Sequence, residues 1–380
     1  MTLKGKWYAL YLRRGPVSLV LLSLLLLLFL VFVTGVSRIF FAQQQMLAVR
    51  WSQRGESDLN AHRYQSAVEE LRAALRYARD DSNYQLSLAE ALMGMGRSSE
   101  AEAYLVNLWA EQPENGRINL DLARVAARDS QTQRALRYYH NAIYANWPGD
   151  QQTEIRDTRI ELIEYLLRIK ATAQAQSELI SLQVYLGDEP GSQAQLGDLF
   201  MRTGDYEHAL AAYRMRLSAT PHDAAVLAAA GNAAFELGRY AAASHYFEER
   251  ISLVPDDAKS RDRLKLAGLV LKMDPFRSQI SAAERDKAVV ADFAVAGDRL
   301  KSCPVAASYS SSSDPKKDLS QEWAELKTKV TLEGLRRNPD LLNTSMSTVF
   351  AIERQASIWC GAPTDADSAL LLISKSHEGI

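Results

Sequence analysis

Residues 196–221 read LGDLFMRTGDYEHALAAYRMRLSATP, and residues 230–255 read AGNAAFELGRYAAASHYFEERISLVP. The two stretches match when one is moved along the other by 34 residues. A fixed period of this length indicates an array of repeated helical hairpins, each stacked on its neighbours, and not one compact domain. The recurring positions are Gly197, Gly204, Tyr206, Ala209, Tyr213 and Pro221, matched by Gly231, Gly238, Tyr240, Ala243, Phe247 and Pro255.

These spaced residues resemble the consensus of the tetratricopeptide repeat (TPR). The resemblance implies an all-α fold, a right-handed TPR α-solenoid, whose work is to bind other proteins. Gly197 and Gly231 would let two helix backbones approach closely. Gly204 and Gly238 would turn the chain through a positive φ at the end of the first helix of each hairpin. The prolines would end the second helix.

Weaker copies of the pattern precede these two units. Three of them cover residues 48–81, 82–115 and 116–149, and a fourth follows. In that fourth unit Ala175 comes 40 residues after Ala135, six more than the period. We expect the extra residues to lie in a polar loop over residues 149–154. The sequence therefore predicts about six helical hairpins, which form a TPR array over residues 48–257.

A solenoid needs capped ends, because each hairpin leaves an apolar face for a neighbour. We expect a degenerate pair of capping helices within residues 258–303, at about 258–273 and 282–302. The second opens with a capping-box pattern, Ser281 followed three residues later by Glu284.

Beyond the cap, residues 304–317 read as a Ser-rich flexible linker. A small C-terminal helical module should follow over residues 318–377. We expect its helices at about 318–337, 341–359 and 365–374. Sustained alternation of apolar and polar residues is absent from the whole sequence, so almost no sheet is expected.

The N-terminal region carries a second strong pattern. No charged residue occurs from Gly15 to Ser37, and the middle is nearly all Leu, Val and Phe. About 20 apolar residues suffice to cross a bilayer. Four basic residues lie within residues 1–14, and only Arg38 closely follows. The positive-inside rule therefore predicts a cytoplasmic N-terminus over residues 1–14, a transmembrane helix over 15–37 and an extracytoplasmic array.

A cleaved signal peptide is the alternative, with a cleavage site in the small residues near Thr34 and Gly35. The apolar core is longer than the 7–15 residues typical of such peptides, which favours an uncleaved anchor. No Pro occurs between Val17 and Trp51, so the membrane helix is expected to run directly into the first hairpin. The arrangement resembles bacterial inner (cytoplasmic) membrane proteins with one N-terminal anchor and periplasmic TPRs.

The composition narrows the choice of partners. The formal net charge is −2 with 24% charged residues, which argues against a nucleic-acid binder because such proteins need a basic excess. The two cysteines, Cys303 and Cys360, suit a disulfide in an oxidising compartment. The alternative is a pair of unpaired buried thiols. Two cysteines without neighbouring histidines do not make a zinc site.

No pattern in the sequence indicates catalysis. The six histidines lack metal-ligand spacing, and no nucleophile elbow, Walker loop or Rossmann fingerprint occurs. We therefore predict no enzymatic activity, no catalytic residue, no metal and no cofactor. Carboxylates in the C-terminal module give only a thin case for an enzyme.

We expect partner binding to occur in the concave groove. In TPR proteins the first helix of each hairpin lines this groove. Alignment to the Gly and Ala markers assigns thirteen residues to it. They are Arg117, Asp121, Arg124, Arg128, Asp157, Glu161, Glu164, Gln195, Asp198, Arg202, Asn232, Phe235 and Glu236.

Two interpretations of this polar row stay open. In the first, the basic row of the third unit simply pairs with the acidic row of the fourth, and each exposed pair contributes only about 0–1 kcal/mol. In the second, the row is a peptide-binding strip in which Arg124 and Arg128 fork a carboxylate.

Two functions suit a membrane-tethered TPR array of this kind. The first is a scaffold or adaptor that holds protein subunits of an envelope or membrane complex. The second is a chaperone-like assembly factor that receives exported or membrane-complex clients. A stable complex of fixed stoichiometry would favour the scaffold, and weak binding to varied peptides would favour the chaperone.

Overall fold

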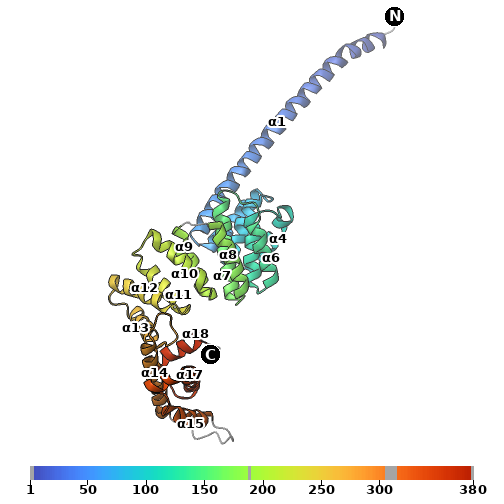
Figure 1. Cartoon of the computed structure of the whole chain (residues 1–380). Helices are drawn as coiled ribbons and strands as arrows, with labels where there is room; N and C mark the ends of the chain where they lie inside the picture. Colours follow the sequence, from blue (N-terminus) through green and yellow to red (C-terminus); the bar gives the residue numbers. More distant parts are fainter. Residues whose placement is uncertain (1–3, 187–189, 304–314, 378–380) are drawn as a thin grey trace. The chain divides into compact units, whose positions relative to one another are not determined.

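The computed structural model describes residues 4–186, 190–303 and 315–377. Within these ranges the chain forms eighteen α-helices, and the only β-type contact is a bridge between Asn115 and Asn146 (Figure 1). The all-α prediction is confirmed. The helices gather into two compact units, Met1–Tyr165 and Leu166–Ile380, and each unit is described by itself.

The first unit is a series of antiparallel helices in which each helix packs on the next, from α1 to α6. Its first helix is also its longest, because α1 runs without a break through the whole apolar N-terminal segment into the first hairpin. The helices are α1 (Lys4–Asn60), α2 (Tyr64–Tyr77), α3 (Ser82–Gly94), α4 (Ser98–Glu111), α5 (Gly116–Arg128), α6 (Thr132–Ile143) and the first part of α7 (Gln151–Arg168).

The turn inside each hairpin shows the period directly. Six residues with positive φ occupy these turns, and the φ angles of Gly204 and Gly238 are +76° and +71° as predicted. Three of the six are not glycines. The series runs His62, Gly96, Ser130, Lys170, Gly204 and Gly238, so the spacing is 34 residues except for one step of 40. The repeat number and the six-residue insertion are both confirmed by this series.

The location of the insertion differs from the prediction of a polar loop over residues 149–154. Only Gly149 and Asp150 of that stretch lie outside a helix, because α7 begins at Gln151. Helix α7 has 18 residues, whereas the equivalent helix α5 has 13. Most of the extra chain therefore lengthens the first helix of the fourth hairpin. Asp150 accepts hydrogen bonds from the backbone and hydroxyl of Thr153 at the start of that helix.

Side-chain caps mark where the first helix of several hairpins begins. Asp81 and Asn115 each accept two backbone N–H groups of the following turn. Asp223 and Asp257 accept one each, from Val226 and Ser260. A cap of this type satisfies a donor that the helix itself leaves unpaired, which contributes about 1 kcal/mol. The 34-residue spacing within each pair of caps follows the repeat.

Close helix packing explains the small residues that recur in the two quoted stretches. A methyl group on Gly197 would lie 2.5 Å from a ring carbon of Tyr213, and one on Gly231 would lie 2.6 Å from a ring carbon of Phe247. Both rings are buried, with 1% of their surface exposed. The two helices of each hairpin are therefore held at a distance that only glycine permits.

Replacing Gly231 with alanine should destabilise the second unit by about 1–2 kcal/mol, because Phe247 must move and the gain in helix propensity offsets only part of that cost. Gly268 is the matched control. It also lies in a helix, but no atom lies within 4 Å of the place that a methyl group on it would occupy. Gly268→Ala should therefore stabilise by up to about 1 kcal/mol. Chemical denaturation of the two variants measures both effects, and equal shifts would contradict the close-packing explanation.

The second unit continues the array and ends in a helical module. Its helices pack in sequence from α9 to α14, and α18 returns to pack on α13. They are α8 (Thr172–Leu186), α9 (Pro190–Thr203), α10 (Tyr206–Ala219), α11 (Ala224–Glu236), α12 (Tyr240–Leu253), α13 (Ala258–Met273), α14 (Ala282–Ser302), α15 (Pro315–Lys327), α16 (Leu332–Arg337), α17 (Asp340–Trp359) and α18 (Asp365–Ser376).

Helices α13 and α14 occupy the residues expected for the capping pair, and the capping box of Ser281 and Glu284 is formed. One boundary in the C-terminal module was wrong. The single helix expected over 318–337 is broken into α15 and α16 at residues 328–331. Thr331 caps α16 by accepting the backbone N–H of Gly334, so the chain must restart a helix there. The predicted Ser-rich linker falls largely on residues 304–314, outside the described residues.

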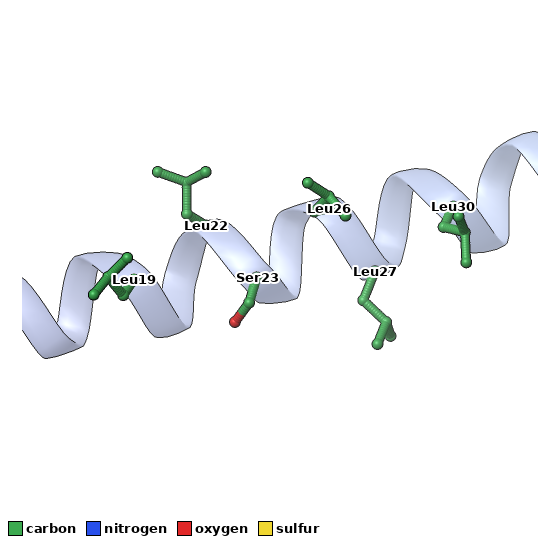
Figure 2. Close-up of a pocket in the computed structure, with 6 residues that line it drawn as sticks. All are labelled: Leu19, Leu22, Ser23, Leu26, Leu27 and Leu30. Atoms are coloured by element: carbon green, nitrogen blue, oxygen red, sulfur yellow. The ribbon is translucent and has the colours of Figure 1, made fainter.

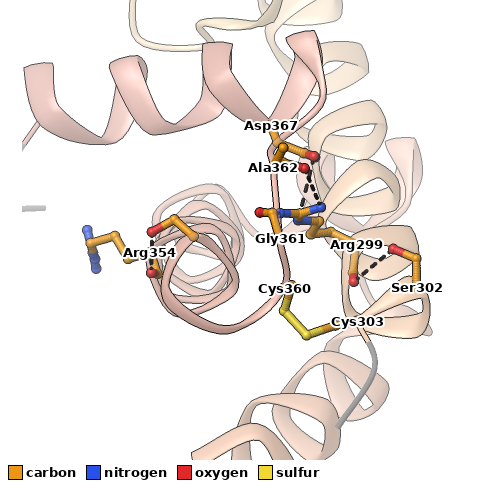
Figure 3. The surroundings of a disulfide bond; sticks show 9 residues. Arg299, Ser302, Cys303, Arg354, Cys360, Gly361, Ala362 and Asp367 are labelled. Carbon is orange, nitrogen blue, oxygen red and sulfur yellow. Dashed lines mark hydrogen bonds and ion pairs between the residues drawn. A yellow bond between two sulfur atoms is a disulfide. The ribbon is translucent and has the colours of Figure 1, made fainter. Parts of the chain in front are cut away.

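The cysteines meet at the ends of two helices. Cys303 follows α14 and Cys360 follows α17, and the structure joins them with their Cα atoms 4.9 Å apart (Figure 3). Arg299, one turn before Cys303, donates to the carbonyl oxygens of Gly361 and Ala362 at 3.0 and 3.3 Å. Both contacts fix the loop between α17 and α18 against α14.

The apolar part of α1 has the chemistry of a membrane span. By length and composition it is the one helix in the described chain that could cross a bilayer, and a signal sequence would pass the same test. Figure 2 shows leucine side chains projecting from several sides of the helix, with Ser23 as the polar exception. The Ser23 hydroxyl donates to the carbonyl of Val20, and the Thr34 hydroxyl donates to that of Val31. Neither hydroxyl therefore needs a partner from the solvent.

Candidate partner-binding cleft

A cleft of about 560 Å³ opens on the first unit. The end of α1, the turn after it, and helices α3, α5 and α7 all contribute to its wall. Its apolar and aromatic side is formed by Leu59, Tyr64, Met93, Leu120, Trp147 and Pro148. Its charged side is formed by Glu90, Arg117, Asp121, Arg124, Arg128 and Glu154, and His62 lies at its edge.

Helix α5 supplies the charged stripe because of its spacing. Arg117, Asp121, Arg124 and Arg128 follow one another at intervals of four, three and four residues, so they lie on one face. The opposite side of the helix is anchored in the core by residues such as Ile118 and Leu122. All four residues were assigned to the groove from sequence, and the structure brings them together in this cleft.

Trp147 lines the cleft and is itself held firmly. It lies against Gly116, where a methyl group would be 2.3 Å from its ring, and its indole N–H donates to the carbonyl of Ala142 at 2.8 Å. The connector that carries it is tied to the turn before α5, because Gly116 donates to Asn146 and Asn146 donates to Glu114. The wall is therefore preformed.

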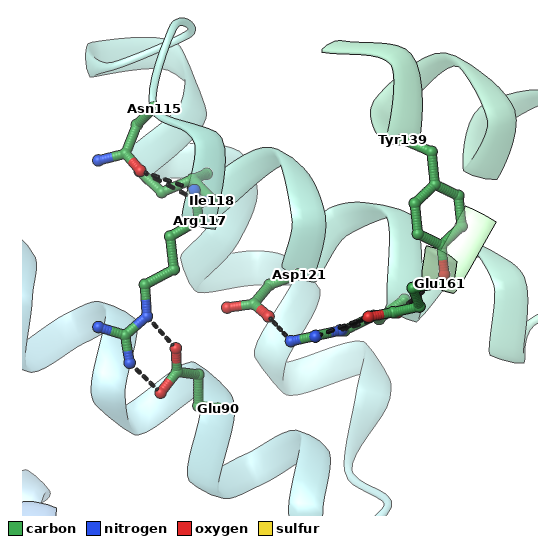
Figure 4. A network of polar contacts seen from close by, with 8 residues as sticks. Glu90, Asn115, Arg117, Ile118, Asp121, Tyr139 and Glu161 are labelled. Carbon is green, nitrogen blue, oxygen red and sulfur yellow. Dashed lines mark hydrogen bonds and ion pairs between the residues drawn. The ribbon is translucent and has the colours of Figure 1, made fainter. Parts of the chain in front are cut away.

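Arg117 pairs with a residue of the preceding repeat. Its Nε and Nη2 atoms both donate to the carboxylate of Glu90 on α3, which forms a bidentate pair (Figure 4). The Arg117 side chain is still 49% exposed. A guanidinium has five N–H donors, so this arginine keeps hydrogen-bonding capacity toward the cleft.

Arg124 pairs forwards, with the fourth unit. It donates to both carboxylate oxygens of Glu161, the shortest contact being 2.7 Å, and to Asp121 at 3.1 Å. Tyr139 adds a hydroxyl donor to Glu161 at 3.0 Å. These partners raise the pKa of Arg124 further above its usual value, against the opposing effect of burial. The pairing of a basic third unit with an acidic fourth unit is confirmed for Arg124 and Glu161.

Asp121 differs from the other charged groups because its side chain is fully buried. One oxygen accepts from Arg124, and the other finds no hydrogen-bond partner among the described residues. Figure 4 shows that second oxygen directed toward the side of Arg117 and Glu90. Burial raises the pKa of Asp121 to about 7, and the nearby Glu90 adds to the effect. The cleft therefore contains a carboxyl whose protonated form is favoured more than that of an ordinary aspartate.

The remaining predicted residues of these two units have varied positions. The Arg128 Nη1 donates to the carbonyl of Met93 at 2.7 Å and reaches Ser98, which fastens α5 to the end of α3. Asp157 is exposed and pairs with its neighbour Arg156. Glu164 is partly exposed and lies outside the cleft wall. In the peptide-binding interpretation Arg124 and Arg128 bind one carboxylate together. Both arginines already have hydrogen-bond partners within the protein.

In the second unit the predicted groove residues do not form a comparable cleft among those described. Gln195, Asp198 and Arg202 are exposed or partly exposed along α9, and Asp198 accepts the hydroxyl of Tyr213 at 2.6 Å. Asn232 is partly exposed.

Helix α13 covers the end of this row. Phe235 is 4% exposed, and the guanidinium of Arg263 lies 4.5 Å from its ring centre. Glu236 pairs with the same arginine at 3.1 Å. Phe235 therefore contributes to packing between neighbouring helices and not to an open surface.

Sequence reasoning missed several members of the cleft wall. Glu90, Tyr64 and Trp147 were not assigned to it, although Glu90 is the residue at the groove position of the second unit. Its spacing to Arg117 gave a usable signal, because groove positions of neighbouring units lie side by side in a TPR array. Trp147 lies on a connector, where repeat alignment gives no information.

Comparison with known proteins agrees with the fold. Residues 86–151 and 195–258 match a family model of the tetratricopeptide repeat. The chain therefore contains tetratricopeptide repeats over these residues. Repeats of this class are in general non-catalytic and bind other proteins.

Two curated relatives share part of the sequence. The tetratricopeptide repeat protein 21 homologue of Caenorhabditis elegans is 29% identical over 199 residues, and that of Caenorhabditis briggsae is 26% identical over 192. Each match covers 50% of this chain but only 14% of the relative. The chain thus spans a small fraction of the length of these proteins.

Solved structures with the same repeats are more distant in sequence. The C-terminal part of a TPR protein from Cytophaga hutchinsonii matches with a TM-score of 0.46 at 15% identity, covering 63% of this chain and 94% of the other. Pseudomonas aeruginosa PilF matches with 0.41 at 17%, covering 58% and 97%. PilW, described as a type IV pilus biogenesis factor, matches with 0.40 at 15%, covering 57% and 96%. These similarities say nothing about what this chain binds.

Proposed function

We propose that this chain is a membrane-anchored, extracytoplasmic TPR scaffold or adaptor that holds a segment of another protein in the cleft of its first unit. The observation that carries the proposal is the cleft itself, in which a preformed aromatic wall faces a row of oriented charges around the buried Asp121. We place the anchor in a bacterial inner membrane, with the N-terminus in the cytoplasm and the array in the periplasm.

The chemistry of the cleft suits an extended polypeptide. Arg117 and Arg124 are each about half exposed and held in place by carboxylates, so their free N–H groups can donate to peptide carbonyl or carboxylate oxygens. Tyr64 and Trp147 offer apolar surface for a side chain. Preorganised groups of this kind lower the entropic cost of binding a flexible segment.

Photo-crosslinking tests the cleft in intact membranes. A photoreactive amino acid at Glu154, which is exposed on the cleft wall, should capture a fixed set of membrane or envelope proteins. The matched control is Gln133, on α6 and outside the cleft wall. A varied collection of exported proteins captured at low yield would favour the chaperone-like role. Equal capture from both positions, or none from Glu154, would refute the cleft as the binding site.

Alkaline carbonate washing tests the anchor. We expect the full-length chain to stay in the membrane fraction, because the exposed apolar side chains of α1 from Leu19 to Val36 cost far less free energy in lipid than in water. A peripheral protein of the same preparation serves as the control that must be released. Release of a shortened chain would instead establish the cleaved signal peptide.

A further inference from the structure

Helix α1 is almost free of charged residues over a longer distance than a bilayer requires. Between Gly15 and Val49 the only charged residue is Arg38. A helix of about 35 residues is roughly 50 Å long, whereas the hydrocarbon core is about 30 Å thick. At any depth of the anchor, a part of this nearly uncharged helix therefore lies outside the lipid and next to the first hairpin.

The two sides of α1 differ in this region. One side faces the array: Ala48 and Ser52 are buried, and Leu71 of α2 lies against Gly55 one turn later on the same face. The other side is uncovered. Ile39 is 63% exposed and Met46 is 67% exposed, and Ala42, Met46 and Val49 line a shallow hollow along the helix. Phe40 and Phe41, on the opposite side, are also exposed, so the array covers one side of this helix only from Ala48 onward.

The uncovered side has the spacing of a coiled-coil seam. Its residues alternate at intervals of four and three: Gly35, Ile39, Ala42, Met46, Val49 and Gln53. This seven-residue repeat keeps one narrow stripe of the helix facing a partner helix, where each side chain can enter a hole formed by four residues of the partner.

We propose that this stripe, the α1 seam, pairs with the same stripe of a second copy of the chain to form a parallel dimer above the membrane. The inference rests on the anchoring proposed above, because an anchor brings every copy to the same depth and orientation. Ala42 then meets Ala42, and Met46 meets Met46. Gln53 in the seam meets its own copy, and a polar residue there favours an in-register pair.

The flanks of the seam agree with self-pairing. In a parallel pair, the residues before Ile39 and Met46 each face the residue five places later on the other helix. Arg38 therefore faces Gln43 of the second copy, and Gln45 faces Arg50. No like charges meet along this stretch. Association would place two clefts on one membrane site and so double the local concentration of bound segments.

Cysteine cross-linking of the full-length chain in its membrane tests the seam. Met46→Cys should give a disulfide-linked dimer on mild oxidation, at about ten times the yield of Gln44→Cys, because Gln44 lies on the opposite side of the helix and outside the hollow. The parent chain is the blank for its own two cysteines. Equal yields at the two positions, or a product with the mass of a different protein, would overturn the proposal.

A charge in the seam provides a measurement that does not depend on oxidation. Met46→Arg combined with Val49→Arg should convert the dimer to a monomer in single-molecule photobleaching, whereas Gln44→Arg, on the opposite side of the helix, should leave it dimeric. Both seam residues are exposed, so circular dichroism should remain helical. A monomeric parent chain would refute the dimer. The carbonate wash reports on the anchor separately, so failure of the anchor and failure of the seam are distinguishable.

Discussion

Replacing Asp292 with asparagine should stabilise the second unit at pH 8 and change little at pH 4. Asp292 lies on α14 with only 1% of its surface exposed, and neither carboxyl oxygen has a hydrogen-bond partner among the described residues. Burial raises its pKa to about 8, and the nearby Asp274 adds to the effect. We expect a gain on the order of 2–4 kcal/mol at pH 8, because the shift in pKa is a difference in folding free energy.

The sign follows from proton binding. An ordinary aspartate in the unfolded chain loses its proton near pH 4, whereas Asp292 in the folded chain keeps its proton until about pH 8. Between these values the folded state binds more protons than the unfolded state, so the free energy of unfolding falls as the pH rises. Below pH 4 both states are protonated and the penalty is absent. Asparagine does not titrate and so removes this pH dependence.

Thermal unfolding of the full-length chain in detergent across this pH range measures the effect. Asp298→Asn is the matched control, because Asp298 is on the same helix but its side chain is 76% exposed and pairs with Lys301. The control should change the free energy of unfolding by less than about 0.5 kcal/mol at any pH. A destabilised Asp292→Asn variant at pH 8 would mean that the carboxylate has a stabilising partner.

Much of the fold could be predicted because the same residue pattern recurs in several repeats. Ala209 and Ala243 give the phase, and the same phase locates hairpins whose turns carry His62, Ser130 or Lys170 in place of glycine. Those three residues adopt a positive φ, which is uncommon for residues other than glycine. Their identity therefore gives no local signal of a turn at these positions. The helix boundaries near residue 282 were also accurate, because a capping box is a local signal.

The candidate site was harder to predict, because it depends on how neighbouring units are placed. Alignment brought Arg124 and Glu161 together correctly, but it left Arg117 without Glu90, its partner in the preceding unit. The burial of Asp121 depends on packing that spacing alone does not describe. Similarly, the break between α15 and α16 depends on one side-chain cap, Thr331, within an otherwise helical pattern.

Removing the link between Cys303 and Cys360 should destabilise the second unit by about 4 kcal/mol. The two residues are 57 positions apart, and in the chain-entropy model a cross-link that closes a loop of this size restricts the unfolded chain by about that amount. The link also holds the end of α17 beside Arg299, whose pairing with Asp367 at 3.6 Å is nearly buried. Loss of the bond should therefore loosen α18 as well as α17.

Unfolding midpoints with and without reductant measure this effect, and the Cys303→Ser, Cys360→Ser double variant is the control that reductant should leave unchanged. On a non-reducing gel the parent chain should migrate faster than after reduction, and Cys303→Ser should abolish the difference.

Thiol labelling then separates two explanations of a negative result. If both cysteines label fully in protein prepared without reductant, the bond is absent in the cell. If neither cysteine labels and the unfolding midpoint still does not move, the bond forms but adds no stability. The packing of α17 on α14 then already holds the loop that the bond closes, and the stability of this module comes from its helix contacts.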